Sequence, residues 1–291
     1  MTLLQKLDQY EKLLRLDKPI GILLLLWPTL WGLWISAAGA PHWKVVWIFV
    51  VGTVLMRSAG VAINDFADRN FDGLVARTRN RPLATGAVQP KEALIIAAVL
   101  ALIAFVLILP LGRLVIALSF CALFLAITYP FCKRFFSLPQ AYLGIAFGFG
   151  IPMAFAAHTH RVPALAWLLV LANIFWTVAY DTEYAMVDRE DDRKIGIRTS
   201  AILFGRWDVA VVMLCHAAFL VMLAGIGWHL QFGWMYYVAL AAAAVLIGYQ
   251  YTLIRERDPA RCFRAFLDNN WVGGVIFAGI ALSYLQTAAG G

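Results

Sequence analysis

The fold of this chain is indicated by residues 44–72, which read KVVWIFVVGTVLMRSAGVAINDFADRNFD. Residues 44–64 are almost entirely apolar and match the roughly 20 residues that a helix needs to cross a bilayer. Three aspartates then follow at positions 65, 68 and 72, where the chain leaves the apolar stretch. Charged side chains at the edge of a membrane span are costly unless they are paired or functional. The stretch therefore predicts a membrane helix with a functional site at its end.

The composition of the whole chain is that of a membrane protein. Hydrophobic residues make up 62% and charged residues only 14%, whereas a soluble domain carries roughly a quarter charged residues. We predict an all-α polytopic membrane protein with a single domain over residues 1–291. Gly144-x-x-x-Gly148 predicts close helix packing. The nine candidate spans are about 20–39, 44–64, 92–110, 112–130, 140–158, 163–186, 209–228, 233–254 and 271–288.

The distribution of basic residues predicts the orientation of these spans. With the N-terminus in the cytoplasm, 20 of the 24 Lys and Arg residues fall in inside segments and three fall outside, which satisfies the positive-inside rule. Residues 65–91 and 187–208 are then cytoplasmic loops. Residues 1–19 are predicted to form an amphipathic segment on the membrane surface, with an apolar face made by Leu3, Leu7, Tyr10 and Leu14.

The acidic residues gather in two similar clusters, and none of the 17 falls in an outside segment. The first cluster ends the second span, and the second, within YDTEYAMVDREDD (180–192), ends the sixth. Each contains Asp-x-x-x-Asp, which on a helix places two like charges on one face. We therefore predict that the clusters are halves of one site. Their members are Asn64, Asp65, Asp68 and Asp72 in the first, and Asp181, Asp188 and Asp192 in the second.

Repelling carboxylates of this kind gain most from a hard divalent cation. Mg²⁺ usually takes one or two carboxylates and binds substrate phosphates, so two facing clusters could hold two ions with a diphosphate between them. The plainer alternatives are solvated helix ends for the carboxylates and membrane anchoring for the loop cations, but an arginine within a span is usually functional. The cations suited to a phosphate are Arg57, within the second span, and Arg77, Arg79, Arg81, Lys133 and Arg134 in loops.

In its motifs, the chain resembles the UbiA superfamily of intramembrane aromatic prenyltransferases. The matching segments are RLDKPIGILLLLWPTLWGLW (15–34), RSAGVAINDFADRNFD (57–72), RTRNRPL (77–83), TYPFCKR (128–134) and AYDTEYAMVDREDDRKIGIRTSAILFG (179–205). The forms RLDKPIG and YDTEYAMVDREDD are typical of the branch that uses 4-hydroxybenzoate. The resemblance implies about nine helices around a central cavity that opens toward the cytoplasmic side.

The resemblance also implies roles for individual residues. Asn64, Asp68 and Asp72 would hold Mg²⁺ on one side of a prenyl diphosphate, and Asp188 and Asp192 would hold it on the other. Arg134 would act in catalysis with these four aspartates, by holding the aromatic carboxylate or the diphosphate. The substrate-binding residues expected are Arg57, Asn64, Arg77, Arg81, Lys133 and Asp181.

The implied activity is transfer of a polyprenyl group from polyprenyl diphosphate to 4-hydroxybenzoate in ubiquinone biosynthesis, in the bacterial inner membrane. Asp188 or Asp181 is a candidate acceptor of the phenol proton. The net charge of +7 is explained by topology and membrane lipid, so nucleic acid is not an expected partner. The alternatives are a naphthoate, homogentisate or haem prenyltransferase and, less favoured, a secondary transporter. We expect no role for Glu183 or Glu190.

Overall fold

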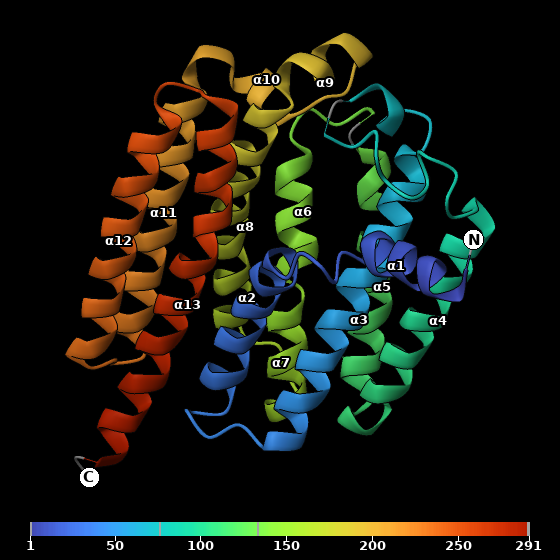
Figure 1. The fold of residues 1–291 in the computed structure, drawn as a ribbon. Helices are drawn as coiled ribbons and strands as arrows, with labels where there is room; N and C mark the ends of the chain where they lie inside the picture. The colour runs from blue at the N-terminus through green and yellow to red at the C-terminus, as the bar shows by residue number, and fades with distance from the viewer. Residues whose placement is uncertain (1, 76, 133, 290–291) are drawn as a thin grey trace.

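The computed structural model describes residues 2–75, 77–132 and 134–289 (Figure 1). All regular secondary structure within these ranges is helical, which confirms the predicted all-α class. The α-helices are α1 (Leu3–Leu14), α2 (Ile20–Ser36), α3 (Trp43–Asp68), α4 (Pro90–Ile108), α5 (Arg113–Cys132), α6 (Pro139–Gly148), α7 (Gly150–Thr159), α8 (Ala164–Val187), α9 (Arg189–Ile195), α10 (Ser200–Phe204), α11 (Asp208–His229), α12 (Trp234–Ile254) and α13 (Pro259–Ala289).

The helices agree with most of the predicted spans but differ at three. In the described part of the chain, 8 helical segments are long and apolar enough to cross a membrane. Helix α2 is apolar but has only 17 residues, so the predicted count of nine is not confirmed. The fifth span divides at Phe149 into α6 and α7, and α13 begins at Pro259 rather than near residue 271.

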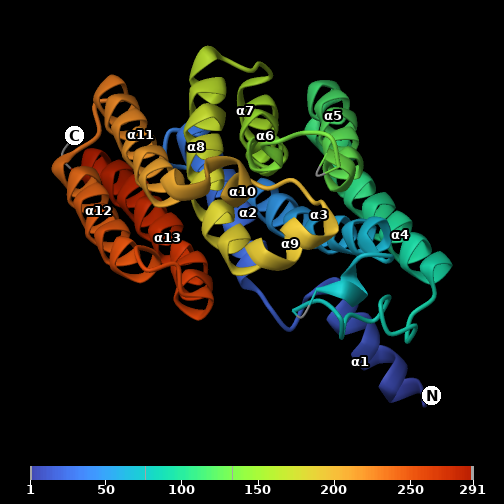
Figure 2. The same cartoon turned by 90° about the horizontal axis from the view of Figure 1, so that it is seen from above.

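The packing of the helices brings the two acidic clusters to one end of the molecule. Helix α2 packs against α3, α7 and α13, and α8 packs against α6, α11 and α13. Seen from above, α11, α12 and α13 form one side and α3, α4 and α5 the other (Figure 2). Helices α9 and α10 and the loop after α3 lie together at one end (Figure 1). The ends of α3 and α8, which carry the two clusters, therefore face the same region.

Buried aromatic rings and close helix contacts hold this arrangement. Trp31 and Trp176 are fully buried, with ring centroids 5.3 Å apart, and Phe219 stacks on Trp176 at 5.5 Å. Such pairs add to the stabilisation from burial itself. A Cβ atom at Gly144 would lie 2.8 Å from the Cα atom of Ile174, so α6 approaches α8 as closely as only glycine permits. This confirms the close packing predicted from the glycine spacing.

Helix α1 is anchored to the bundle at its C-terminal half. Leu13 is fully buried among side chains of α3, α4 and the loop between them. Leu3 and Leu7, on the predicted apolar face, are exposed to 77% and 52%. Tyr10 and Leu14, on the same face, pack against the bundle. The apolar face thus divides between protein and exterior, and the membrane-surface location of residues 1–19 stays a prediction.

Candidate active site

The two acidic clusters line one small pocket of about 100 Å³. Asp68 and Asp72 come from the first cluster, and Asp188 and Asp192 come from the second. Their side chains belong to segments more than a hundred residues apart in the sequence, so only the fold brings them together. Other residues that line this pocket include Arg77, Arg81, Tyr129, Gln140, Asp181 and Tyr184.

The first cluster is formed by the end of α3 and the turn that follows. The Nδ2 atom of Asn64 donates to Oδ2 of Asp68 at 3.2 Å, which confirms that these residues share a helix face. Helix α3 ends at Asp68, and Asp72 begins a 3₁₀ turn, η1 (Asp72–Leu74). The predicted helical pairing of Asp68 with Asp72 is therefore wrong. Asp72 enters the pocket because the chain turns, and the Thr78 hydroxyl fixes the turn by donating to the Asp72 carbonyl at 2.8 Å.

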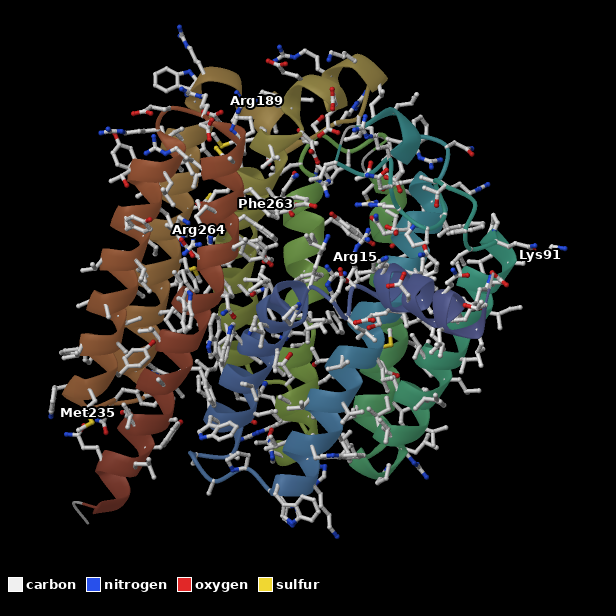
Figure 3. All side chains as sticks on the ribbon, viewed as in Figure 1. Arg15, Lys91, Arg189, Met235, Phe263 and Arg264 are labelled. Atoms are coloured by element: carbon white, nitrogen blue, oxygen red, sulfur yellow. The ribbon has the colours of Figure 1, made fainter. Side chains whose placement is uncertain are left out.

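Two arginines neutralise the first cluster. Arg81 Nη1 lies 3.0 Å from Oδ1 of Asp72 and 3.0 Å from Oδ1 of Asp65. Burial raises the pKa of Asp72, while the Arg81 guanidinium acts in the opposite direction. Asp65 is fully buried and also pairs with Arg15 at 3.1 Å. Figure 3 shows Arg15 near the middle of the bundle, at the end of α1. Asp65 thus fixes the segment that carries the cluster.

The second cluster lies where α8 passes into α9. Asp188 separates the two helices, and the N–H of Asp192 donates to the Asp188 carbonyl at 2.9 Å. The predicted helical spacing of these two aspartates is therefore confirmed. Arg77 reaches across from the first loop, with Nε 2.9 Å from Oδ2 of Asp188 and its guanidinium 4.5 Å from the Tyr184 ring centroid. This ion pair joins the two halves of the site.

A much larger cavity of about 1560 Å³ adjoins the polar pocket. The two share Arg77, Arg81, Tyr129, Asp181 and Tyr184, so the polar pocket continues into the larger space. Much of the lining is apolar, and the apolar side chains contributed by α3, α4, α5 and α7 include Phe49, Ala101, Phe105, Ile108, Leu123 and Met153. This arrangement suits a ligand with a charged head and a long apolar tail.

Arg57 enters the large cavity from α3. Its Nε donates to the Gly21 carbonyl at 3.2 Å, and its guanidinium lies 6.0 Å from the Phe147 ring centroid. Among the described residues no carboxylate oxygen lies within 4 Å of it. Asn64 lines the same cavity, as expected for a residue seven positions further along the same helix. A cation without a carboxylate partner in an apolar cavity is suited to an anionic ligand.

Two other predicted residues, Arg134 and Arg79, do not line the pocket. Arg134 is exposed, donates to the Ala67 carbonyl at 2.8 Å and lies 5.6 Å from the Phe71 ring centroid, so it contacts the end of α3 and the turn that follows. Arg134 is not among the described residues that line either cavity. Arg79 is exposed. Lys133 lies outside the described residues. The catalytic role of Arg134 stays a prediction.

Sequence reasoning missed a buried polar network behind the second cluster. Glu183, to which we assigned no role, is fully buried and accepts a hydrogen bond from Asn269 Nδ2 at 2.8 Å. Its Oε1 lies 3.6 Å from Nε2 of His216, which is also fully buried. Trp176 Nε1 donates to Asn269 Oδ1 at 2.9 Å. An acid within an apolar span is the signal that could have found this network.

A second missed feature is Asp208, at the start of α11. It is fully buried and forms ion pairs with Arg189 of α9 and with Arg257, whose Nε lies 3.0 Å from Oδ1 of Asp208. Figure 3 shows Arg189 at the end of the molecule that carries α9 and α10. Arg189 directly follows Asp188, so Asp208 anchors the segment that carries the second cluster. Only tertiary packing creates this contact.

The donor set around the pocket fits a hard divalent cation. It consists of carboxylate and amide oxygens, which such cations prefer, from Asn64, Asp68, Asp72, Asp188 and Asp192. No group of three acidic, histidine or cysteine side chains in the described residues is already arranged as a metal site. Arginines face several of the carboxylates instead, so cation binding requires those carboxylates to exchange partners.

Comparisons with known proteins agree on the family. A sequence model of the UbiA prenyltransferase family matches residues 25–282. A 4-hydroxybenzoate octaprenyltransferase of Nitrosospira multiformis is 66% identical over 289 residues, covering 99% of this chain and 100% of that protein. Another, from Thiobacillus denitrificans, is 62% identical over 285 residues, covering 98% and 97%.

Solved structures are similar in fold. The apo structure of a UbiA homolog from Aeropyrum pernix K1 has a TM-score of 0.79 at 27% identity, covering 90% of this chain and 97% of that one. A UbiA homolog from Archaeoglobus fulgidus bound to GPP and Mg²⁺ has a TM-score of 0.68 at 17% identity, covering 94% and 99%. With its apolar helices and these relatives, the chain is an integral membrane protein that belongs to the UbiA prenyltransferase family.

Proposed function

We propose that the protein transfers a polyprenyl group from polyprenyl diphosphate to the ring carbon ortho to the hydroxyl of 4-hydroxybenzoate, with release of diphosphate, in ubiquinone biosynthesis. The observation that carries this proposal is the junction of a polar pocket lined by two acidic clusters with a large apolar cavity. The names of the relatives at 62–66% identity specify the same acceptor.

The polar pocket is the proposed site of the diphosphate. Asn64, Asp68 and Asp72 on one side and Asp188 and Asp192 on the other would hold Mg²⁺, which would neutralise charge on the diphosphate leaving group. Arg77 and Arg81 already lie at the pocket and supply forked donors for phosphate oxygens. Arg134 and Lys133 are further candidates for the diphosphate or the carboxylate. Asp68, Asp72, Asp188, Asp192 and Arg134 are thus the proposed catalytic residues.

The apolar cavity provides the environment that the reaction needs. The allylic C–O bond breaks, diphosphate leaves with the bonding electrons, and the acceptor ring carbon bonds to the allylic carbon. Water would capture the cationic intermediate, so apolar walls that exclude it protect the reaction. Tyr129, Tyr180 and Tyr184 line the cavity near the polar pocket and present faces that stabilise a cation. Asp181 or Asp188 accepts the phenol proton, and loss of the ring proton restores aromaticity.

Arg57 is the proposed anchor of the acceptor carboxylate. It lies in the large cavity without a carboxylate of the protein beside it, in the part of the chain that the structure describes. A 4-hydroxybenzoate carboxylate would supply the missing negative charge. The acceptor ring would then extend from Arg57 toward the polar pocket, because Arg57 and Asn64 share one face of α3.

We further propose that the protein lies in the bacterial inner membrane with its N-terminus in the cytoplasm. The support is the excess of basic residues at one end and the gathering there of α9, α10 and the loop after α3 (Figure 1). Helix α2 completes nine spans in this arrangement.

Incubation of membranes with labelled 4-hydroxybenzoate, a polyprenyl diphosphate and Mg²⁺ tests the proposal. Label should move into the lipid fraction, and EDTA should prevent the transfer until Mg²⁺ is restored in excess. Unlabelled naphthoate, homogentisate or haem should not compete at equal concentration. Transfer that persists in EDTA would refute the metal dependence, and transfer to one of the competing acceptors would reassign the branch.

A further inference from the structure

The glycine of the RLDKPIG segment lies directly against the Arg57 guanidinium. Gly21 is in the first turn of α2, and Arg57 projects toward it from α3. The Gly21 carbonyl accepts the hydrogen bond from Nε of Arg57 at 3.2 Å. A Cβ atom at position 21 would lie 2.5 Å from Nη2 and 2.9 Å from Nε of Arg57. The missing side chain of Gly21 is therefore the space that the guanidinium occupies.

Backbone conformation does not explain the glycine at this position. The φ angle of Gly21 is not in the positive range that favours glycine, and the residue lies within a helix. Alanine is a better helix former than glycine, so the helix itself would favour alanine here. The first atoms that an added methyl group meets belong to the end of a flexible side chain and not to the backbone. Substitution would consequently move the guanidinium rather than the helix.

The location of the guanidinium matters because Arg57 lies within a span, lines the apolar cavity and has no carboxylate within 4 Å among the described residues. Its direction is set by two contacts, the Gly21 carbonyl and the Phe147 ring. A bidentate contact between arginine and a carboxylate depends on the orientation of the planar group. A displacement of the guanidinium would therefore weaken the recognition of an acceptor acid.

We propose that Gly21 is a positioning residue for Arg57 and thereby sets the specificity for an acceptor that carries a carboxylate. The inference rests on the proposed function, in which Arg57 anchors that carboxylate. Glycine leaves room for the guanidinium against α2 and offers its carbonyl as the acceptor that orients Nε. Gly21 thus acts on the acceptor and not on the diphosphate.

Steady-state kinetics of the purified full-length protein test this proposal. Gly21→Ala should raise KM for 4-hydroxybenzoate about tenfold, the effect of one weakened charge-assisted hydrogen bond. The KM for the polyprenyl diphosphate should change less than twofold. Arg57→Ala should raise KM for 4-hydroxybenzoate further, and adding Gly21→Ala to it should have no additional effect, because the two residues act through one group. Gly225→Ala is the matched control, since a Cβ there meets no atom within 4 Å.

A neutral acceptor analogue gives a second measurement. Methyl 4-hydroxybenzoate has no carboxylate, so its competition against 4-hydroxybenzoate should improve about tenfold in Gly21→Ala relative to the wild type. An unchanged acid-to-ester preference, additive effects of the two substitutions, or a Tm lower than that of Gly225→Ala would each overturn the role of Gly21. If Arg57→Ala leaves KM for 4-hydroxybenzoate unchanged, the assignment of Arg57 in the proposed function fails instead, together with the inference that depends on it.

Discussion

The two acidic clusters face the same pocket but are held in place differently. In the first, Arg81 binds both Asp65 and Asp72 from within the same loop, and Arg15 binds Asp65 from the end of α1. In the second, Asp188 is bound by Arg77, which belongs to the loop of the first cluster. The second cluster is otherwise anchored from behind, through the buried Asp208.

This difference assigns the loop after α3 an organising role. Its arginines reach both clusters, whereas Arg189 of α9 pairs with Asp208 and Lys194 of α9 pairs with Asp191, both away from Arg77 and Arg81. A diphosphate that draws Arg77 and Arg81 to its oxygens would release carboxylates on both sides at once. Changes in this loop should therefore affect both halves of the site, and changes around Asp208 should affect the second half alone.

The largest expected effect is loss of a pocket carboxylate. Asp68→Asn and Asp192→Asn should each lower kcat/KM by about 1,000-fold. Each substitution removes a negative charge that would hold the metal ion, and with it stabilisation of the charge that develops on the diphosphate in the transition state. Initial rates at saturating and limiting prenyl diphosphate measure the effect. Glu190→Gln, an exposed change on the same helix as Asp192, is the control and should retain normal turnover. Equal losses in all three variants would contradict the assignment.

The buried aspartates behind the clusters should differ in their contribution to stability. Asp65→Asn leaves Arg15, which is 21% exposed, without a carboxylate and leaves Arg81, which is 13% exposed, with Asp72 alone, and should cost about 3 kcal/mol. Asp208→Asn should cost less, about 2 kcal/mol, because Arg257 is 38% exposed and water screens it. Thermal unfolding of the purified protein measures both. A larger loss for Asp208→Asn would reverse the comparison.

Hydropathy and charge predicted those parts of the fold that depend on one segment at a time. The apolar runs located most of the helices, and the glycine spacing predicted close packing at Gly144 without identifying α8 as the partner. The break at Phe149 was not predicted, because Gly148, Gly150 and Pro152 leave the hydropathy of the span continuous. The predicted start of the last span was too late because Arg261, Arg264 and Asp268 give the first turns of α13 a composition that resembles a loop.

The candidate site was predicted in part for the same reason. Residue types and spacing indicated which carboxylates gather, but helical spacing misplaced Asp72, which lies beyond the end of α3. Contacts between Arg77 and Asp188, or between Arg189 and Asp208, depend on how separate segments pack. Glu183 was given no role although it lies within an apolar span, and its partners Asn269 and His216 come from helices that only the fold brings beside it.

An intermediate effect is expected when the Arg77–Asp188 ion pair, which links the two clusters, is weakened. Arg77→Lys keeps the charge but loses the forked contact with Asp188 and the stacking on Tyr184. The KM for polyprenyl diphosphate should rise about tenfold while the KM for 4-hydroxybenzoate stays within twofold. Arg79→Lys, an exposed change in the same loop, is the matched control and should change neither constant. A rise in the KM for 4-hydroxybenzoate alone would move Arg77 to the acceptor side.

The smallest effect concerns the attachment of α1, whose Arg15 reaches the first cluster. Lys6 pairs with Glu92 at 2.7 Å, but both side chains are partly exposed, at 26% and 32%. Lys6→Ala should therefore lower Tm only slightly. Leu13→Ala, which removes a fully buried side chain between α3 and α4, should cost about 2–5 kcal/mol and should also raise the KM for polyprenyl diphosphate, because Arg15 loses its support. If Lys6→Ala lowers Tm as much as Leu13→Ala does, then the Lys6–Glu92 ion pair rather than the burial of Leu13 attaches α1. The first cluster, like the second, would then depend on an ion pair that lies outside the pocket.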